Sequence, residues 1–349
     1  ESISASYFQP GKAYIAVDRH LLGDAKPYFY KTTNYGESWE LLSGEGNAIP
    51  MDYNARVLRE DPKKEGLLFA GTEYGLFISM DDGKHWKLFQ QNLPVTPITD
   101  LKIFRNDLIL STMGRGFWIL DNIGALRQEP MQNLGNAPVL FQPDPTIRYR
   151  YPMTGHSGIP EYPRTHVAID YYLPKGWDKE VQLEIFDSQN TLVATIVGTE
   201  EQMEKKVEVE ENMDLSETFR YVDVSLKATE GMHRFEWDLS MQGPWDANKR
   251  RRYKNGPMVP PGNYMVQITA GDTVLQQPFE IVIDPRLSDA GVTSEDIQTQ
   301  VKFQKEVIDV LSEARQFTDA LEKEAEKLKG KPEASTQLQT LENTLSQLK

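Results

Sequence analysis

Two copies of one pattern decide the fold: Tyr28-Phe-Tyr-Lys-Thr-Thr-Asn-Tyr-Gly-Glu-Ser-Trp39 and Gly75-Leu-Phe-Ile-Ser-Met-Asp-Asp-Gly-Lys-His-Trp86. In each copy an aromatic-rich run is followed by Thr or Ser, then Asn or Asp, then Gly and Trp at the same spacing. The second copy begins 47 residues after the first. A period of about 40 to 50 residues is typical of repeats that each form one four-stranded sheet. The repeat therefore predicts a row of small antiparallel sheets.

The repeated pattern has the chemistry of a tight hairpin turn. Its Asn or Asp side chain can accept hydrogen bonds from backbone amides, its glycine can adopt positive φ, and its tryptophan can pack under the turn. Because these roles explain the whole pattern, we expect the following residues to be structural and not catalytic: Asn34, Gly36, Trp39, Asp81, Gly83 and Trp86. Apolar runs fill the gaps, so residues 1–125 are predicted to hold two blades of a β-propeller and most of a third.

These residues resemble the Asp-box repeats, also called BNR repeats, of sialidases, xyloglucanases and the sortilin-type propeller. The second copy fits fully, and the first has an amide in place of the acid. Closer still is the resemblance to bacterial secreted BNR-repeat proteins of the glycosyl hydrolase type with sortilin-like propellers. Three runs look like the closing blades of that group: Arg59-Glu-Asp-Pro62, Gly71-Thr-Glu-Tyr-Gly-Leu-Phe77 and Gly114-Arg-Gly-Phe-Trp-Ile-Leu-Asp121.

The resemblance implies more propeller than the sequence contains. Propellers close with about four to eight blades, and three blades leave open sheet edges. We therefore expect the remaining N-terminal propeller blades of the same protein, before Glu1, as a partner. The resemblance also implies a secreted or cell-envelope protein of a bacterium that engages a protein or a glycan.

Composition excludes several classes of protein. The 349 residues include 38 Lys and Arg against 52 Asp and Glu, a formal net charge of −14, which argues against nucleic acid because the phosphate backbone is bound by basic surfaces. No stretch approaches the roughly 18 apolar residues that a helical membrane span needs. The absence of cysteine excludes disulfides and thiolate sites and departs from animal sortilins. The five histidines have no zinc-site spacing, so we expect no metal and no cofactor.

Two changes in composition follow the blades. Residues 126–165 are rich in proline, which predicts a linker. Residues 166–285 hold six alternating apolar runs with turns between them, which predicts a β-sandwich. The sandwich looks like an immunoglobulin-like or fibronectin type III-like module, with Trp237 and Tyr264 as its expected core aromatics.

Residues 286–349 switch to the period of a helix. Apolar residues recur at three- and four-residue steps from Phe303 to Leu321, and Gly330-Lys-Pro332 separates them from a second run of leucines. The pattern predicts an α-helical hairpin packed on the sandwich or on a further partner. The whole chain is thus predicted to be mainly β: a partial propeller, a sandwich and a C-terminal helical hairpin.

The best candidates for ligand binding lie at one end of the predicted blades. Four of them fall on loops between second and third strands and one near a connection between blades: Arg19, His20, Glu73, Arg115 and Arg56. A guanidinium can clamp a carboxylate or phosphate with two hydrogen bonds, so an acidic sugar or a peptide terminus is one ligand class. The alternative is that Arg59, Glu73 and Arg115 form ion pairs between blades.

No complete catalytic set is visible in the sequence. A glycosidase needs two carboxylates flanking the scissile bond, and Glu60, Asp61 and Glu73 supply one of them at most. We therefore expect a non-catalytic protein- or glycan-binding or scaffold region. The alternatives are the C-terminal part of a sialidase- or xyloglucanase-like glycoside hydrolase, and a subunit of a cell-surface or secretion assembly. An acidic run at 200–217 and a basic cluster at 249–254 are expected to be solvated loops.

Overall fold

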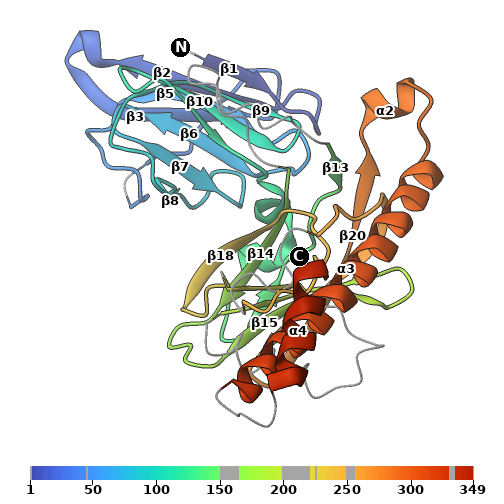
Figure 1. Cartoon of the computed structure of the whole chain (residues 1–349). Coiled ribbons are helices and arrows are strands. Elements are labelled where there is room, and N and C mark those ends of the chain that lie inside the picture. Colours follow the sequence, from blue (N-terminus) through green and yellow to red (C-terminus); the bar gives the residue numbers. More distant parts are fainter. Residues whose placement is uncertain are drawn as a thin grey trace. The chain divides into compact units, whose positions relative to one another are not determined.

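The computed structural model describes residues 2–44, 46–149, 165–198, 221–224, 226–248, 256–329 and 335–348. The chain divides into two compact units, unit 1 from Glu1 to Asn133 and unit 2 from Leu134 to Lys349 (Figure 1). The structure is mainly β, with its α-helices at the C-terminal end. Within the described residues, no helix combines the length and the apolar character needed to cross a membrane.

Unit 1 contains three antiparallel sheets that follow one another in the chain. The first has the order β1-β2-β3-β4, the second β5-β6-β7-β8 and the third β11-β10-β9. Their elements are β1 (Ser2–Ala5), β2 (Ala13–Arg19), η1 (His20–Leu22), β3 (Asp24–Thr32), β4 (Glu40–Leu41), β5 (Ala55–Glu60), β6 (Leu68–Thr72), β7 (Leu76–Ser79), β8 (Lys87–Leu88), β9 (Ile98–Phe104), β10 (Asp107–Thr112), β11 (Phe117–Leu120), η2 (Gly124–Arg127) and η3 (Glu129–Gln132). Each strand pairs with its neighbour in sequence, as in a propeller blade, so unit 1 is propeller-like.

The sheets of unit 1 share two apolar cores. Tyr14 and Phe29 of the first sheet are buried together with Phe77 of the second. Leu76, also of the second sheet, is buried in another cluster with Leu110 of the third. Because the second sheet contributes to both cores, β6 and β7 are buried at every residue. Their sequences are accordingly apolar up to a last polar residue, Thr72 or Ser79, without the alternation of a strand that has one solvated face.

The turns after β3 and β7 are built by the same side-chain hydrogen bond. Asn34 Oδ1 accepts from the main-chain N–H of Ser38 at 3.0 Å, and Asp81 Oδ1 accepts from that of His85 at 2.9 Å. The amide of the first copy thus replaces the acid of the second without a change of acceptor. Burial opposes ionisation of Asp81, but hydrogen bonds from the His85 main chain and ring and from Ser79 outweigh it and lower the pKa of Asp81.

The glycines and tryptophans of the two turns differ in their surroundings. Gly36 and Gly83 adopt φ of 90° and 85°, the left-handed region that the turn requires. Trp86 is 3% exposed and its Nε1 donates to the carbonyl of Leu42 at 3.0 Å, so it joins the core between the first two sheets. Trp39 is 39% exposed and packs beside Gly36. The same turn therefore supports a core in one copy and a surface in the other.

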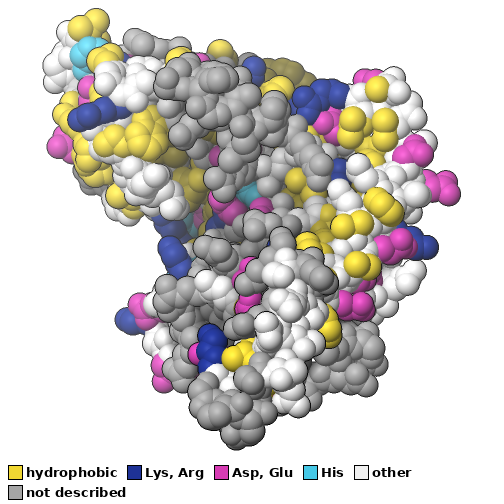
Figure 2. Space-filling model, viewed as in Figure 1, with side chains coloured by type: hydrophobic (Ala, Val, Ile, Leu, Met, Phe, Trp, Pro, Cys, Tyr) yellow, Lys and Arg dark blue, Asp and Glu magenta, His cyan; other side chains and the backbone are white. Residues whose placement is uncertain are grey.

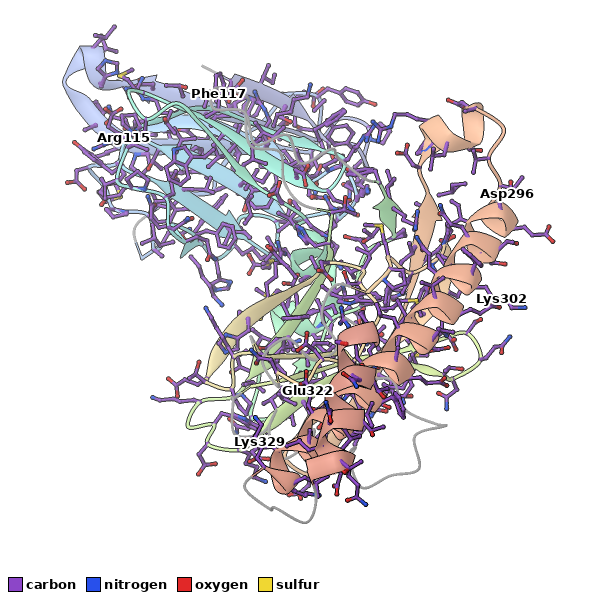
Figure 3. The ribbon with its side chains drawn as sticks, viewed as in Figure 1. Arg115, Phe117, Asp296, Lys302, Glu322 and Lys329 are labelled. Carbon is purple, nitrogen blue, oxygen red and sulfur yellow. The ribbon has the colours of Figure 1, made fainter. Side chains whose placement is uncertain are left out.

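The third sheet has three strands within the described residues and an uncovered apolar face. Phe117 of β11 pairs with Ser111 of β10, and Leu76 of β7 pairs with Gly71 of β6. Phe117 therefore holds in the third sheet the position that Leu76 holds in the second. Leu76 and Ile78 are 2% and 4% exposed, whereas Phe117 and Ile119 at the matching positions are 80% and 58% exposed. Figure 3 marks Phe117 in the third sheet. No described residue covers this face as the third sheet covers the second.

Unit 2 contains two sheets and the α-helices. A six-stranded sheet has the order β13-β20-β19-β15-β16-β17, and a three-stranded sheet has the order β12-β14-β18. The elements are β12 (Val139–Leu140), β13 (Thr146–Arg148), β14 (Val167–Leu173), β15 (Val181–Asp187), β16 (Leu192–Val197), β17 (Tyr221–Val224), β18 (Gly231–Trp237), β19 (Gly262–Ala270), β20 (Thr273–Ile283), α2 (Pro285–Asp289), α3 (Ser294–Leu328) and α4 (Ser335–Leu348). β13 with β20 and β16 with β17 are parallel pairs, and the other pairs are antiparallel.

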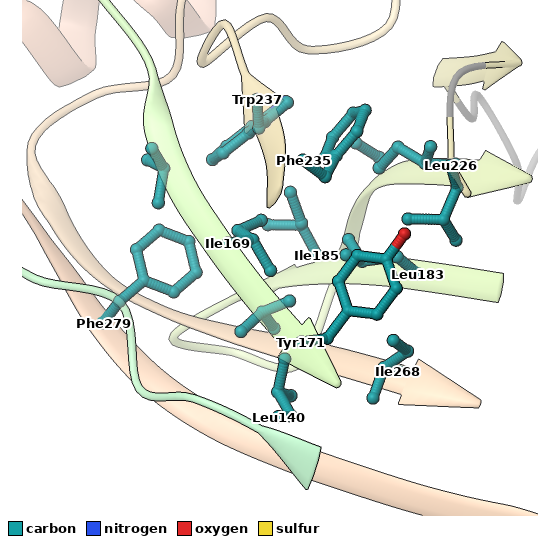
Figure 4. Packing of buried hydrophobic residues seen from close by; sticks show 14 of the residues in the cluster. Leu140, Ile169, Tyr171, Leu183, Ile185, Leu226, Phe235, Trp237, Ile268 and Phe279 are labelled. Atoms are coloured by element: carbon teal, nitrogen blue, oxygen red, sulfur yellow. The ribbon is translucent and has the colours of Figure 1, made fainter. Parts of the chain in front are cut away.

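One apolar core joins the two sheets of unit 2 (Figure 4). Ile169 of β14 and Trp237 of β18 are buried in it with Ile185 of β15. The prediction of Trp237 and Tyr264 as core aromatics is confirmed, since both are buried and their ring centroids lie 6.4 Å apart. Trp237 also meets Phe279 edge-on at 6.2 Å, a favourable arrangement for aromatic pairs.

The segment expected to be a linker contributes strands to unit 2. Val139 and Leu140 pair with β14, and residues 146–148 pair with β20. The reason is local: short apolar pairs between the prolines can still add to a sheet edge. Residues 150–164, the acidic run at 200–217 and the basic cluster at 249–254 lie outside the described residues.

The helix α3 does not bury the stripe that its sequence period marks. A capping box of Thr293 and Asp296 begins the helix. The buried positions are Val301 and Ser312, with Ile297 and Ala325, whereas the side chains from Phe303 to Phe317 on the predicted face are exposed. Ser312 Oγ accepts from the main-chain N–H of Trp245 at 3.0 Å. The stripe therefore does not pack on the sandwich, and the other expectation, a further partner, stays a prediction.

Candidate functional site

Three of the predicted binding residues meet at one end of unit 1 through a carboxylate. Arg56 of β5 donates from Nε to Glu73 Oε2 at 2.9 Å and from Nη2 to the same oxygen. Its Nη1 lies 3.2 Å from Asp18 Oδ2 in β2. The ring Nδ1 of His20 lies 2.7 Å from that Asp18 oxygen. The guanidinium thus bridges the first and second sheets, and we call these four residues the Arg56 cluster.

Strand register brings the Arg56 cluster together. Ala55 at the start of β5 pairs with Thr72 at the end of β6, so Arg56 and Glu73 lie beside each other. The main-chain N–H of Glu73 donates to the carbonyl of Asn54 at 3.0 Å, which fixes the loop. Asp18 reaches the same place because β2 of the first sheet packs against β5 of the second.

The carboxyl of Asp18 is held ionised. Burial of this side chain opposes ionisation, but hydrogen bonds from the His20 main chain and ring and the charge of Arg56 outweigh it and lower the pKa of Asp18. The main-chain N–H of His20 donates to Asp18 Oδ1 at 2.9 Å. Asp18 is therefore an anchor for its two neighbours and unsuited to act as a general acid, which must be protonated at the operating pH.

Tyr74, the residue after Glu73, belongs to an aromatic pair. The ring centroids of Tyr53 and Tyr74 are 4.8 Å apart, and Tyr53 also meets Phe77 edge-on at 6.1 Å. Tyr74 is exposed. Its main-chain N–H donates to Thr72 Oγ1 at 3.3 Å, which holds the loop that carries it. The loop thus carries a carboxylate and an exposed aromatic residue at consecutive positions, a hydrogen-bond acceptor and an apolar face.

The other two predicted binding residues stand apart from this arrangement. Arg19 pairs with Asp24 at 3.3 Å and lies over the ring of Tyr28. Arg115 is exposed on the corresponding loop of the third sheet, before Phe117 (Figure 3). No described hydrogen bond or ion pair joins the Arg115 side chain to the Arg56 cluster.

The alternative of ion pairs between blades applies to one of its three residues. Arg59 Nη2 lies 3.0 Å from Asp100 Oδ1, which connects the second and third sheets. Glu73 pairs instead with Arg56 of its own sheet. Arg115 makes no such pair among the described residues.

The carboxylates Glu60 and Asp61 lie at the opposite end of β5. Glu60 accepts from Ser6 Oγ at 2.6 Å and from the hydroxyl of Tyr14 at 3.1 Å. Asp61 Oδ2 accepts from Arg127 Nε at 3.0 Å and Nη2 at 2.9 Å. Arg56 and Glu60 are four positions apart along β5, roughly 13 Å. Glu60 and Glu73 therefore do not flank one glycosidic bond, for which about 5 to 10 Å is needed.

The free acceptor of the Arg56 cluster is one oxygen of Glu73. Its Oε2 is occupied by Arg56, while no donor of the described residues bonds to Oε1. Two carboxylates already surround the guanidinium, which disfavours an anionic ligand there. Hydroxyl or cationic groups fit better. Within the described part of the chain, no group of three His, Asp or Glu side chains is placed to hold a metal ion.

Sequence reasoning missed Asp18, although a signal for it exists. Tyr14, Ala16 and Asp18 share one face of β2, and the first two are fully buried in the core between the sheets. A charged residue at an inward position of a strand needs a partner, since an unpaired buried charge is costly. That argument calls for a cation from the neighbouring sheet.

Comparisons with known proteins identify no family. No family model matches the chain, and no curated protein matches it. Similar solved structures include an ancestral GH74 enzyme, 25% identical over 33% of this chain and 13% of that one, with a TM-score of 0.27. The extracellular domain of the system BT4673 from B. thetaiotaomicron is 11% identical over 81% of this chain and 31% of that one, with a TM-score of 0.26.

A further similar structure is that of YCF48 bound to D1 peptide, 10% identical over 79% of this chain and 80% of that one, with a TM-score of 0.25. The chain spans less than a third of the length of the first two structures. At such TM-scores these likenesses do not define the fold, which rests on the sheet order and register described above.

Proposed function

We propose that unit 1 is a ligand-binding part of a BNR-repeat, sortilin-like propeller protein, and that it binds the hydroxyl groups of a neutral glycan without cleaving it. The observation that carries this proposal is the free Oε1 of Glu73, whose Oε2 is held by Arg56, on a loop whose next residue, Tyr74, is exposed. A secreted or cell-envelope location is part of the proposal.

The chemistry of the Arg56 cluster favours a glycan over an anion. A fixed carboxylate oxygen can accept from sugar hydroxyls through charge-assisted hydrogen bonds. The apolar face of a sugar ring can pack on an aromatic side chain such as Tyr74, as ligands do in sites that combine aromatic and few polar groups. Because Arg56 already holds Glu73 in place, little ordering is left for binding.

The open face of the third sheet supports a longer propeller. Phe117 and Ile119 are exposed where Leu76 and Ile78 of the second sheet are covered by the next sheet. Further blades of the same protein, N-terminal to this chain, are the proposed cover. The turns at Asn34 and Asp81, with their shared hydrogen bonds, are then Asp-box turns of structural role.

Unit 2 is proposed to be a platform. Its two sheets with one core support an immunoglobulin-like or fibronectin type III-like module, and α3 with α4 support a helical hairpin. The proposed domains are the blades at 1–125, the sandwich at 166–285 and the hairpin at 286–349. The segment 126–165, expected to be a linker, adds the edge strands β12 and β13 to the two sheets of the sandwich.

A glycan panel tests the proposal on the full chain. We expect saturable binding of a neutral glycan, weakened about tenfold or more by Glu73→Gln or Tyr74→Ala. The matched control is Glu65→Gln, which removes an exposed carboxylate from the loop after β5, at the other end of the sheet. Equal binding by Glu73→Gln and the parent, or no binding to the panel, would sink the proposal.

The alternative function is glycoside hydrolysis by a larger protein. Two carboxylates, Asp18 and Glu73, on one guanidinium are the observation that favours it. Release of reducing ends from the panel, lost in Glu73→Gln, would establish the hydrolase and remove the binding-only proposal. A role as a subunit of a cell-surface or secretion assembly would be indicated by a stable partner that co-purifies through residues outside the Arg56 cluster.

A further inference from the structure

The helix α3 has two apolar faces, and one of them is open. Ile297 and Val301 are buried. On the other side Phe303, Val307, Val310 and Phe317 are 65%, 50%, 66% and 56% exposed. Figure 2 shows apolar side chains along this helix with acidic side chains beside them. These four residues and Ala314, which is also exposed, form what we call the α3 stripe.

The spacing of the α3 stripe is that of a coiled-coil seam. Steps of four and three residues alternate without a break, and Leu321 continues the series. In heptad terms two positions repeat, a and d, and they are occupied by Val307, Ala314 and Leu321 at a and Phe303, Val310 and Phe317 at d. Such a seam is built to receive another helix.

The far end of the same seam is already covered by a helix. Ala325 is buried and Leu321 and Leu328 are partly buried. α4 contacts α3 and runs back beside its C-terminal half (Figure 1). With 14 residues against 35, α4 is about 21 Å long and α3 about 52 Å. α4 therefore covers only part of the seam, and the α3 stripe continues from a helix–helix contact that exists.

The negative charges beside the α3 stripe favour a partner with positive charges. Glu306 and Glu313 occupy g positions, because each directly precedes an a residue of the stripe. The e positions, which follow the d residues, carry no charge. Both glutamates are exposed. Two copies of this chain packed antiparallel would bring these glutamates together, and like charges disfavour that arrangement. Lys302 lies away from the g position, and its side chain projects outward (Figure 3).

We propose that the α3 stripe docks an amphipathic helix of a partner protein whose apolar seam is flanked by Lys or Arg. The partner helix would extend the contact that α4 begins and place its cations against Glu306 and Glu313. About four turns of helix, from Phe303 to Phe317, suffice for the three to four apolar anchors that helix-in-groove recognition uses.

The test uses the full chain and a defined probe. The probe is a fluorescent three-heptad peptide with Leu at a and d and Lys at e and g, and its counterpart has Glu at e and g. By fluorescence anisotropy we expect the Lys peptide to bind at least about tenfold more tightly than the Glu peptide. We expect Val310→Asp to weaken binding of the Lys peptide by at least about tenfold.

Controls separate docking from misfolding and from self-association. Gln337→Asp adds the same charge at an exposed position in the first turn of α4 and should bind as the parent does. Circular dichroism should give Val310→Asp the thermal unfolding of the parent, because Val310 is exposed. Sedimentation should find the parent monomeric. No saturable binding, a smaller preference for the Lys peptide, or a dimer that Val310→Asp dissociates would overturn the proposal.

Discussion

Strand β5 carries charged residues at both of its ends, and the two ends differ in what those charges face. At its C-terminal end Glu60 and Asp61 are fully buried and bonded to Tyr14 and Arg127. At its N-terminal end Arg56 is partly buried and leads to Glu73, whose Oε1 is free among the described residues. One strand thus has a closed polar network at one end, in which this chain satisfies the acceptors, and an open network at the other, in which one acceptor is free.

The closed end has every acceptor satisfied by this chain. Tyr14 donates at 2.5 Å to Asp82, and burial with the neighbouring carboxylates raises the pKa of Tyr14, so its hydroxyl remains a donor. Lys12 lies 3.1 Å from the same Asp82. Polar networks that are fully satisfied specify a fold, whereas an unsatisfied acceptor at a surface is available to a ligand. The comparison teaches that burial and satisfaction, and not the presence of carboxylates, separate structure from site.

The largest expected effect is loss of the Asp61–Arg127 pair. Asp61→Ala leaves the Arg127 guanidinium partly buried without its carboxylate, and breaking a buried pair costs about 3 to 5 kcal/mol. Urea unfolding followed by tryptophan fluorescence measures the change. Asp100→Ala, which removes an exposed partner of Arg59, is the control and should cost about 1 kcal/mol or less. Equal losses in the two variants would erase the difference between the ends of β5.

The next effect is that of Tyr14→Phe. The hydroxyl has one proton, which lies between Asp82 and Glu60, and both carboxylates keep other donors such as Lys12 and the main-chain N–H of Gly66. The variant therefore loses one hydrogen bond to a charged group, which contributes about 1.5 to 3 kcal/mol. The control is Tyr28→Phe, whose hydroxyl bonds to Asp24 at 2.8 Å in a less buried place. It should lose less free energy of unfolding than Tyr14→Phe. The reverse order would contradict the assignment of the closed end as structural.

The parts of unit 1 that sequence predicts best are its repeated turns. Their hydrogen bonds join residues four apart, such as Asn34 with Ser38, so the pattern contains the whole interaction. The Arg56 cluster was predicted only in part, because Asp18 and Arg56 are 38 residues apart in sequence and meet through the packing of two sheets. A contact between two sheets joins residues far apart in the chain, so no local sequence pattern predicts it.

The helix α3 marks another limit of sequence reasoning. Its period identifies an apolar face from Phe303 to Phe317, but the face that packs in unit 2 contains Ser312, which bonds to the main chain of Trp245. A serine at that position gives no hydrophobic signal. Periodicity therefore predicts that a face seeks a partner, while the partner itself depends on contacts that the pattern does not contain.

A smaller effect depends on pH and compares the two repeated turns. The pKa of Asp81 in the folded chain is below the unfolded value of about 3.9. The stability that ionised Asp81 contributes is therefore fully present above the unfolded pKa and is lost as pH falls through the folded pKa. Asp81→Asn, which copies Asn34, should lose less free energy of unfolding than the parent between about pH 5 and pH 3. Urea unfolding at several pH values measures this, and parallel curves for the two proteins would contradict it.

The smallest effect on stability is expected at the open end of β5. Glu73→Gln removes a charge from a partly exposed ion pair but leaves Arg56 paired with Asp18, so the free energy of unfolding should change by about 0.5 kcal/mol or less. The same variant should weaken glycan binding about tenfold. Measuring both on one preparation sharpens the comparison, because a large loss of stability would make Glu73 part of the closed network and leave the open end without a ligand acceptor.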